Sequence, residues 1–188
     1  MGTRHLIVVK VDGENKIAQY GQWDGYPSGA GVDVLRFAQK IAGKSVRKNF
    51  ADKVRACSWV TDEKIKSVNK QIESGEIKDW TKMYPEWSRD TGADILNMVF
   101  ENGGLELRDN ITFAADSLFC EWVWVIDLDA NTFEGYEGFN KRPLDVWERF
   151  HYLSQYSDGG YYPVKLVRAY SLDDLPDKAT FLKDFEEE

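Results

Sequence analysis

Histidine is the side chain best matched to proton transfer near neutral pH, and this chain has two, His5 and His151. His5 ends the segment Thr3-Arg4-His5, which joins a hydroxyl, a fixed cation and an imidazole. Such a segment could bind an anion and move a proton. We therefore predict Thr3, His5 and His151 as catalytic residues and Arg4 as a ligand-binding residue. The alternatives are a strand-end histidine with satisfied hydrogen bonds for His5, and a half-buried structural histidine for His151.

The glycine-rich stretch GQWDGYPSGAG, residues 21–31, is the second candidate for a binding site. Its rings, Trp23 and Tyr26, have no obligatory place in a core, and flat rings on a loop suit stacking on a planar ligand. Asp24 lies between them, so we predict Trp23, Asp24 and Tyr26 as ligand-binding residues. The alternative is a tight turn whose glycines permit a positive φ and whose rings cap a sheet.

Other kinds of site are disfavoured by what the sequence lacks. The chain has no phosphate-binding P-loop, no HExxH, no CxxC and no GxSxG pattern. Asp127 and Asp129 resemble half of a metal site, but we interpret them as solvated strand-end acids and predict neither a metal nor a cofactor. Cys57 and Cys120 lack metal-ligand spacing and are interpreted as buried thiols. A net charge of −8 disfavours a nucleic acid polymer as partner but leaves room for a small anion beside local cations.

Two β-rich runs must position these residues. TRHLIVVKV, residues 3–11, is followed by the turn signal Asp12-Gly13 and then by KIAQYGQW, which predicts a β-hairpin. A turn centred between Gly13 and Glu14 would pair His5 with Gln22 and Thr3 with Asp24. The glycine-rich stretch would then begin beside Thr3-Arg4-His5.

The remaining patterns predict helices between the hairpin and later strands. Apolar periods indicate helices from Val32 to about Gly43, at about 46–59, after the N-cap Thr61, at about 91–102, and from Pro143 to about Tyr156. Strict alternation over 118–129 predicts a central strand, with TFEGYEGF as its hairpin partner and YYPVKLVRAYSL as a late strand. We expect a single layered α+β domain, 1–188, with an aromatic insertion at about 78–90 and a frayed acidic tail at about 183–188.

The first thirty residues, GTRHLI…KIAQYGQWDGYPSGAG, resemble the opening of an uncharacterised family of phages, prophages, bacteria and some fungi. The resemblance implies a phage-type accessory protein that acts against host defence, and hence the cytoplasm of a host cell. The early strand and hairpin are also similar to N-terminal-nucleophile hydrolases. That chemistry needs Cys, Ser or Thr at the mature first position, whereas removal of Met1 would expose Gly2.

Three functions remain open from the sequence. The first is metal-independent, phosphodiesterase-like hydrolysis of a small anionic ligand such as a cyclic nucleotide, with Arg4 holding charge and His5 moving a proton. The second is sequestration of that ligand without chemistry. The third is inhibition of a host protein through the aromatic insertion. No apolar run is long enough to cross a membrane, so we expect a soluble, cytoplasmic protein, and a homo-oligomer is left open.

Overall fold

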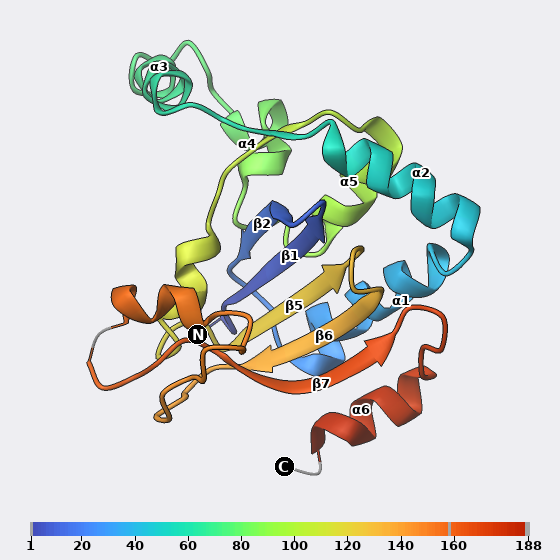
Figure 1. The fold of residues 1–188 in the computed structure, drawn as a ribbon. Helices are drawn as coiled ribbons and strands as arrows, with labels where there is room; N and C mark the ends of the chain where they lie inside the picture. Colours follow the sequence, from blue (N-terminus) through green and yellow to red (C-terminus); the bar gives the residue numbers. More distant parts are fainter. Residues whose placement is uncertain (1, 158, 187–188) are drawn as a thin grey trace.

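A five-stranded mixed sheet forms the centre of the computed structural model, which describes residues 2–157 and 159–186. The strands are β1 (His5–Val11), β2 (Glu14–Gly21), β5 (Trp122–Asp127), β6 (Thr132–Glu137) and β7 (Lys165–Ser171). Their order is β2-β1-β5-β6-β7, with β1 and β5 parallel and the other neighbours antiparallel. Helices pack around this sheet (Figure 1), so the predicted α+β single domain is confirmed.

The N-terminal hairpin forms as predicted, but its register differs by two residues beside the turn and by one residue from Val9 back to His5. Asp12 and Gly13 both have positive φ, 54° and 80°, which is typical of a two-residue hairpin turn. Val11 therefore pairs with Glu14, and an irregularity between Val9 and Lys10 shifts the later pairs. His5 consequently lies opposite Gly21 and not opposite Gln22.

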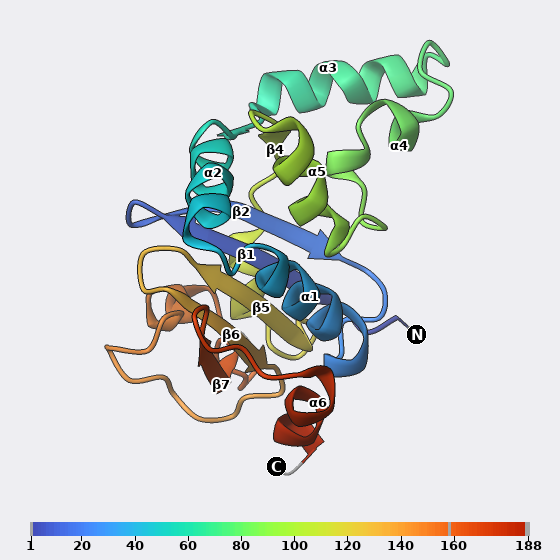
Figure 2. The same ribbon diagram turned by 90° about the vertical axis from the view of Figure 1, so that its right-hand side faces the viewer.

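One face of the sheet is covered by the larger of two main hydrophobic clusters. The helices on this face are α1 (Val32–Lys40), α2 (Lys44–Arg55), α5 (Asp94–Asn102) and α6 (Lys178–Glu186). Figure 2 shows α1 and α6 on this side of the strands. A π-helical turn, η1 (Pro27–Gly31), leads directly into α1. The helix predicted at about 46–59 is α2, which ends earlier because residues 58–59 form a short strand.

The opposite face carries less regular structure. Two 3-10 helices, η3 (Ile111–Ala115) and η4 (His151–Tyr156), contribute to a second cluster around Val123, Val125 and Tyr136. The long helix predicted from Pro143 to Tyr156 was wrong. Residues 144–145 have no regular structure, residues 146–150 form turns and a bend, and only η4 is helical.

A smaller unit lies beyond the edge strand β2. It contains β3 (Ser58–Trp59), α3 (Asp62–Glu73), α4 (Trp80–Met83), η2 (Pro85–Trp87) and β4 (Glu106–Leu107). Thr61 caps α3 by accepting from the Lys64 N–H, as predicted. Within the aromatic insertion, Trp87 is buried, donates to the Glu106 carbonyl and stacks on Tyr84. The insertion therefore docks on its own small core.

The C-terminal segment corrects the prediction of a frayed tail at about 183–188. Residues 183–186 belong to α6, and residues 187–188 lie outside the described residues. Phe181 of this helix is fully buried against Trp124 and Phe133 of the sheet. No helix in the described ranges is long and apolar enough to cross a membrane.

Candidate functional site

Strand alternation separates two of the predicted site residues, Arg4 and His5. His5 shares the helix-covered face with Ile7 and Val9, whereas Arg4 faces the other side of the sheet. The Arg4 guanidinium lies 4.5 Å from the centre of the Phe119 ring, and the Arg4 backbone N–H donates to Glu121. Arg4 and His5 therefore do not share one site.

The glycine-rich stretch does approach His5. Gly25 donates to the Thr3 carbonyl at 2.9 Å, and His5, Trp23 and Asp24 line a common small pocket. The Tyr26 hydroxyl donates to Asp24 at 2.9 Å, but Tyr26 is outside the described lining of that pocket. Of the predicted residues, His5, Trp23 and Asp24 are thus brought together, with Thr3 contributing a backbone contact.

His151 lies on the other side of the sheet from His5. It begins η4, is half-buried, and donates its backbone N–H to the Glu148 carbonyl at 3.0 Å. The two histidines therefore do not form a catalytic pair.

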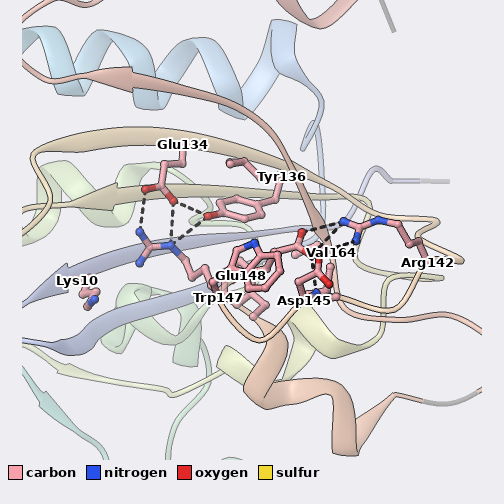
Figure 3. A pocket seen from close by; sticks show the side chains of 12 residues that line it. Lys10, Glu134, Tyr136, Arg142, Asp145, Trp147, Glu148 and Val164 are labelled. Atoms are coloured by element: carbon pink, nitrogen blue, oxygen red, sulfur yellow. Dashed lines mark hydrogen bonds and ion pairs between the residues drawn. The ribbon is translucent and has the colours of Figure 1, made fainter.

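A larger cavity, of about 670 Å³, opens on the less covered face (Figure 3). We call it the Arg149 cavity. Its polar lining consists of Lys10, Glu134, Tyr136, Arg142, Asp145, Glu148 and Arg149. Its apolar lining consists of Leu144, Trp147, Phe150, Val164 and Leu166. Trp147 is 79% exposed, so its ring can meet a ligand. The volume falls within the usual range of small-molecule sites.

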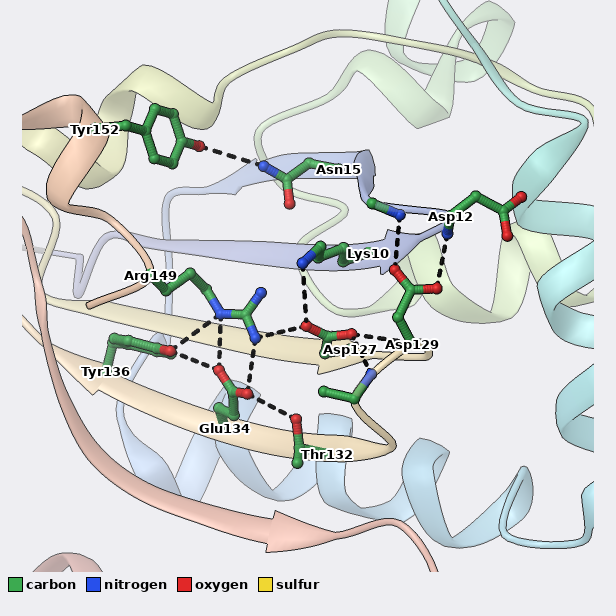
Figure 4. Close-up of polar contacts among 12 residues, drawn as sticks. Lys10, Asp12, Asn15, Asp127, Asp129, Thr132, Glu134, Tyr136, Arg149 and Tyr152 are labelled. Carbon is green, nitrogen blue, oxygen red and sulfur yellow. Dashed lines mark hydrogen bonds and ion pairs between the residues drawn. The ribbon is translucent and has the colours of Figure 1, made fainter. Parts of the chain in front are cut away.

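Arg149 ties the inner end of this cavity together (Figure 4). Its Nη2 donates to Asp127 at 2.7 Å and to Glu134 at 2.8 Å, and its Nε donates to Glu134 at 2.9 Å and to the Tyr136 hydroxyl at 3.1 Å. Lys10 Nζ lies 3.7 Å from the same Asp127 carboxylate. Two buried carboxylates therefore share two cations.

The sheet register explains why these groups meet. Lys10 pairs with Asp127 across the parallel β1–β5 ladder, and Glu134 pairs with Val125 across the antiparallel β5–β6 ladder. Residues spaced by two face the same side of a sheet, so Lys10, Asp127 and Glu134 all face the less covered side. Arg149 is brought over them by the turns of residues 146–150.

The charges in this network are fixed near neutral pH. Burial alone would raise the pKa of Asp127, but the Ala130 backbone N–H and the Arg149 guanidinium outweigh it and hold that pKa below its usual value. Burial and the adjacent Glu134 carboxylate raise the pKa of the Tyr136 hydroxyl well above its usual value. Asp127 thus stays ionised and Tyr136 stays protonated, so neither is suited to exchange a proton with a ligand.

The two carboxylates at the inner end, Asp127 and Glu134, already accept as many hydrogen bonds as they can. Glu134 Oε1 accepts from the Thr132 hydroxyl and from Arg149 Nη2. Glu134 Oε2 accepts from the Tyr136 hydroxyl and from Arg149 Nε. Asp127 Oδ1 accepts from two backbone N–H groups, and Oδ2 faces Arg149 and Lys10. A carboxylate has about four acceptor positions, so both acids are saturated.

The cations, in contrast, keep unused donors. Arg149 Nη1 has no acceptor in the described part of the chain, and Lys10 Nζ has only its ion pair with Asp127. Figure 4 shows no contact drawn to one terminal nitrogen of Arg149. The inner end of the cavity therefore presents donors and few acceptors.

Comparisons with known proteins identify no relative. No protein-family model, no curated protein and no solved structure matches this chain. The resemblances to the phage and prophage family and to N-terminal-nucleophile hydrolases stay predictions.

Sequence reasoning missed Lys10, Glu134, Tyr136 and Arg149, and it misjudged Asp127. Asp127 is 1% exposed and is not a solvated acid, whereas Asp129 is exposed and accepts from the N–H groups of the hairpin turn. The sequence did contain one indication that Asp127 is buried, because alternation places it on the same face as Val123 and Val125. A carboxylate on an apolar face requires a partner, and Arg149 supplies it.

Proposed function

We propose that this protein binds a small anionic, nucleotide-like ligand in the Arg149 cavity and holds it without converting it. The observation that carries this proposal is the imbalance of hydrogen-bonding groups at the inner end, where both acids are saturated and both cations keep free donors. A phosphate or carboxylate group offers the acceptors that such donors need.

The apolar half of the cavity supports a ligand with a planar part. Trp147 is mostly exposed at the cavity, and Leu144 and Phe150 continue the apolar lining. A planar ring packed against indole gains dispersion and stacking energy of roughly 1–3 kcal/mol per base. A nucleotide combines such a ring with an anionic group in one small molecule.

Binding without catalysis is favoured because this cavity has no group prepared for proton transfer. Neither histidine is among the described lining residues, Asp127 stays ionised and Tyr136 stays protonated. The resemblance of the first thirty residues to the phage family supports counter-defence by sequestration in a host cytoplasm. That role rests on the resemblance alone.

Isothermal titration calorimetry with three probes tests the proposal. Cyclic adenosine monophosphate carries both ring and charge, adenosine carries the ring alone, and inorganic phosphate carries the charge alone. We expect the cyclic nucleotide to bind at least about tenfold more tightly than either of the others. Equal binding of adenosine and the nucleotide would show that the free donors of Lys10 and Arg149 play no part.

Matched variants locate the binding. Lys10→Met removes a free donor and should weaken nucleotide binding about tenfold, the loss expected for one hydrogen bond between charged groups. Trp147→Ala should weaken it as well, and Lys16→Met, on the neighbouring strand but outside the lining, should not. Recovery of intact nucleotide after denaturation agrees with sequestration, whereas turnover would support the hydrolysis predicted from the sequence.

A further inference from the structure

His5 borders a second, smaller pocket, of about 200 Å³, on the opposite side of the sheet from Arg149. We call it the His5 pocket. Besides His5, its lining includes Trp23, Asp24, Asp33, Asp90 and Asp94. The pocket forms where the glycine-rich stretch meets the start of α5, and Trp23 Nε1 donates to Asp90 at 2.8 Å across this junction.

His5 is the unusual member of this lining. Its side chain is almost completely buried, with the residue 1% exposed, and neither ring nitrogen has a hydrogen-bond partner among the described residues. A buried polar group without a partner costs about 1–3 kcal/mol, so such groups are rare unless a ligand or water completes them.

Three glycines allow the backbone to approach the imidazole of His5 closely. A Cβ at Gly21 would lie 2.3 Å from His5 Nε2, and one at Gly25 would lie 2.9 Å from Nδ1. Gly92, with φ at +48°, approaches Nε2 in the same way, with its Cβ position at 3.3 Å. Three backbone segments therefore close around a ring whose nitrogens they do not bond.

The charges of the lining select the ligand. Asp24, Asp33, Asp90 and Asp94 all contribute to the pocket, and no Lys or Arg belongs to its described lining. From outside the lining, Arg36 donates to Asp33 at 3.3 Å, and Arg89 Nε lies 3.9 Å from Asp90. Burial lowers the pKa of His5 to about 4 against the opposing effects of Thr3 and Asp24, so the ring is neutral near neutral pH and one nitrogen can accept.

We propose that the His5 pocket binds a small organic cation, whose ammonium N–H groups donate to the aspartate carboxylates and to the unpaired nitrogen of His5. Within residues 2–157 and 159–186, no group of three His, Cys, Asp or Glu side chains is placed to hold a metal ion. An ammonium group needs no such coordination shell. Each of its three N–H groups can donate to a separate acceptor of the pocket.

Calorimetry with putrescine, butanediol and succinate tests this proposal, because the three share a chain of the same length and differ in charge. We expect putrescine to bind at least about tenfold more tightly than butanediol, and succinate not to bind. We also expect the ring resonances of His5 to shift on addition of putrescine. Equal binding of putrescine and butanediol, or a His5 signal that does not move, would overturn the proposal and leave a pocket that holds water only.

Variants separate this pocket from general attraction by an acidic protein. Asp24→Asn and Asp94→Asn keep the shape and should each weaken putrescine binding about tenfold. Glu63→Gln, in the first turn of α3, removes the same charge outside the lining and should leave binding unchanged. Lys10→Met should also leave it unchanged, so the two cavities are tested independently. An equal loss in Glu63→Gln would refute a specific site.

Discussion

Replacing Arg149 by methionine tests whether the buried network holds the less covered face together. The side chain of Arg149 is 18% exposed, and the carboxylates it contacts are more deeply buried. Arg149→Met fills a similar volume but leaves Asp127 and Glu134 without their main partner. Removing one partner of a buried ion pair costs about 3–5 kcal/mol, so we expect the free energy of unfolding to fall by about that amount.

Urea unfolding followed by tryptophan fluorescence measures the loss. In a chain of 188 residues, each kcal/mol corresponds to about 2–4 °C in Tm, so Tm should fall by about 6–20 °C. The matched control is Arg142→Met, whose ion pairs with Glu148 and Asp145 involve a side chain that is 55% exposed. Exposed pairs contribute about 0–1 kcal/mol, so this variant should lose little.

A triple variant sharpens the interpretation. Combining Arg149→Met with Asp127→Asn and Glu134→Gln removes the buried charges together, and it should recover part of the lost stability because no carboxylate is left uncompensated. If Arg149→Met were as stable as Arg142→Met, the network would not stabilise the fold, and the account of its charges would be wrong.

Two further predictions concern the helix-covered face. The pKa of His5 in the folded protein, about 4, lies below its usual value of 6.5, so the fold favours the neutral ring. The contribution of the neutral ring to the free energy of unfolding is complete above pH 6.5 and is reduced by about 3 kcal/mol at pH 4. His5→Leu should therefore lose less stability than the wild type between these pH values in urea titrations, and an equal loss would contradict the assigned pKa. Phe181→Ala should cost about 3–5 kcal/mol, since Phe181 is fully buried against the sheet. A loss below 1 kcal/mol in thermal unfolding would mean that α6 is not docked.

The strands could be predicted from the sequence because burial on a sheet leaves a period of two. The alternation around Trp122 and Trp124 identified β5 and its central position correctly. The predicted pairing of β1 with β2 was wrong because the turn is centred between Asp12 and Gly13 and not between Gly13 and Glu14. In addition, the irregularity between Val9 and Lys10 leaves no pattern in composition. That single shift matters, since it sets His5 opposite Gly21, whose missing side chain makes room for the imidazole.

The Arg149 cavity was missed for a different reason. One of its walls comes from residues 144–150, where apolar spacing suggested a helix but the chain forms irregular structure with turns at 146–150. A helix needs tertiary packing to be stable, and a helical period in a short segment does not guarantee it. The contact between Arg149 and Glu134 depends on that irregular path, and no local rule specifies it.

Net charge alone is a poor guide to the ligands of this protein. The overall charge of −8 disfavours polyanions but does not describe either cavity. At the inner end of the Arg149 cavity, two acids face two bases, yet Asp127 and Glu134 are saturated, so the unused groups there are the donors of Lys10 and Arg149. In the His5 pocket the balance is reversed, because the aspartates and the unpaired imidazole supply acceptors. The hydrogen-bonding capacity that remains after internal contacts, and not the sum of charges, is therefore the basis on which we propose an anion for one face of the sheet and a cation for the other.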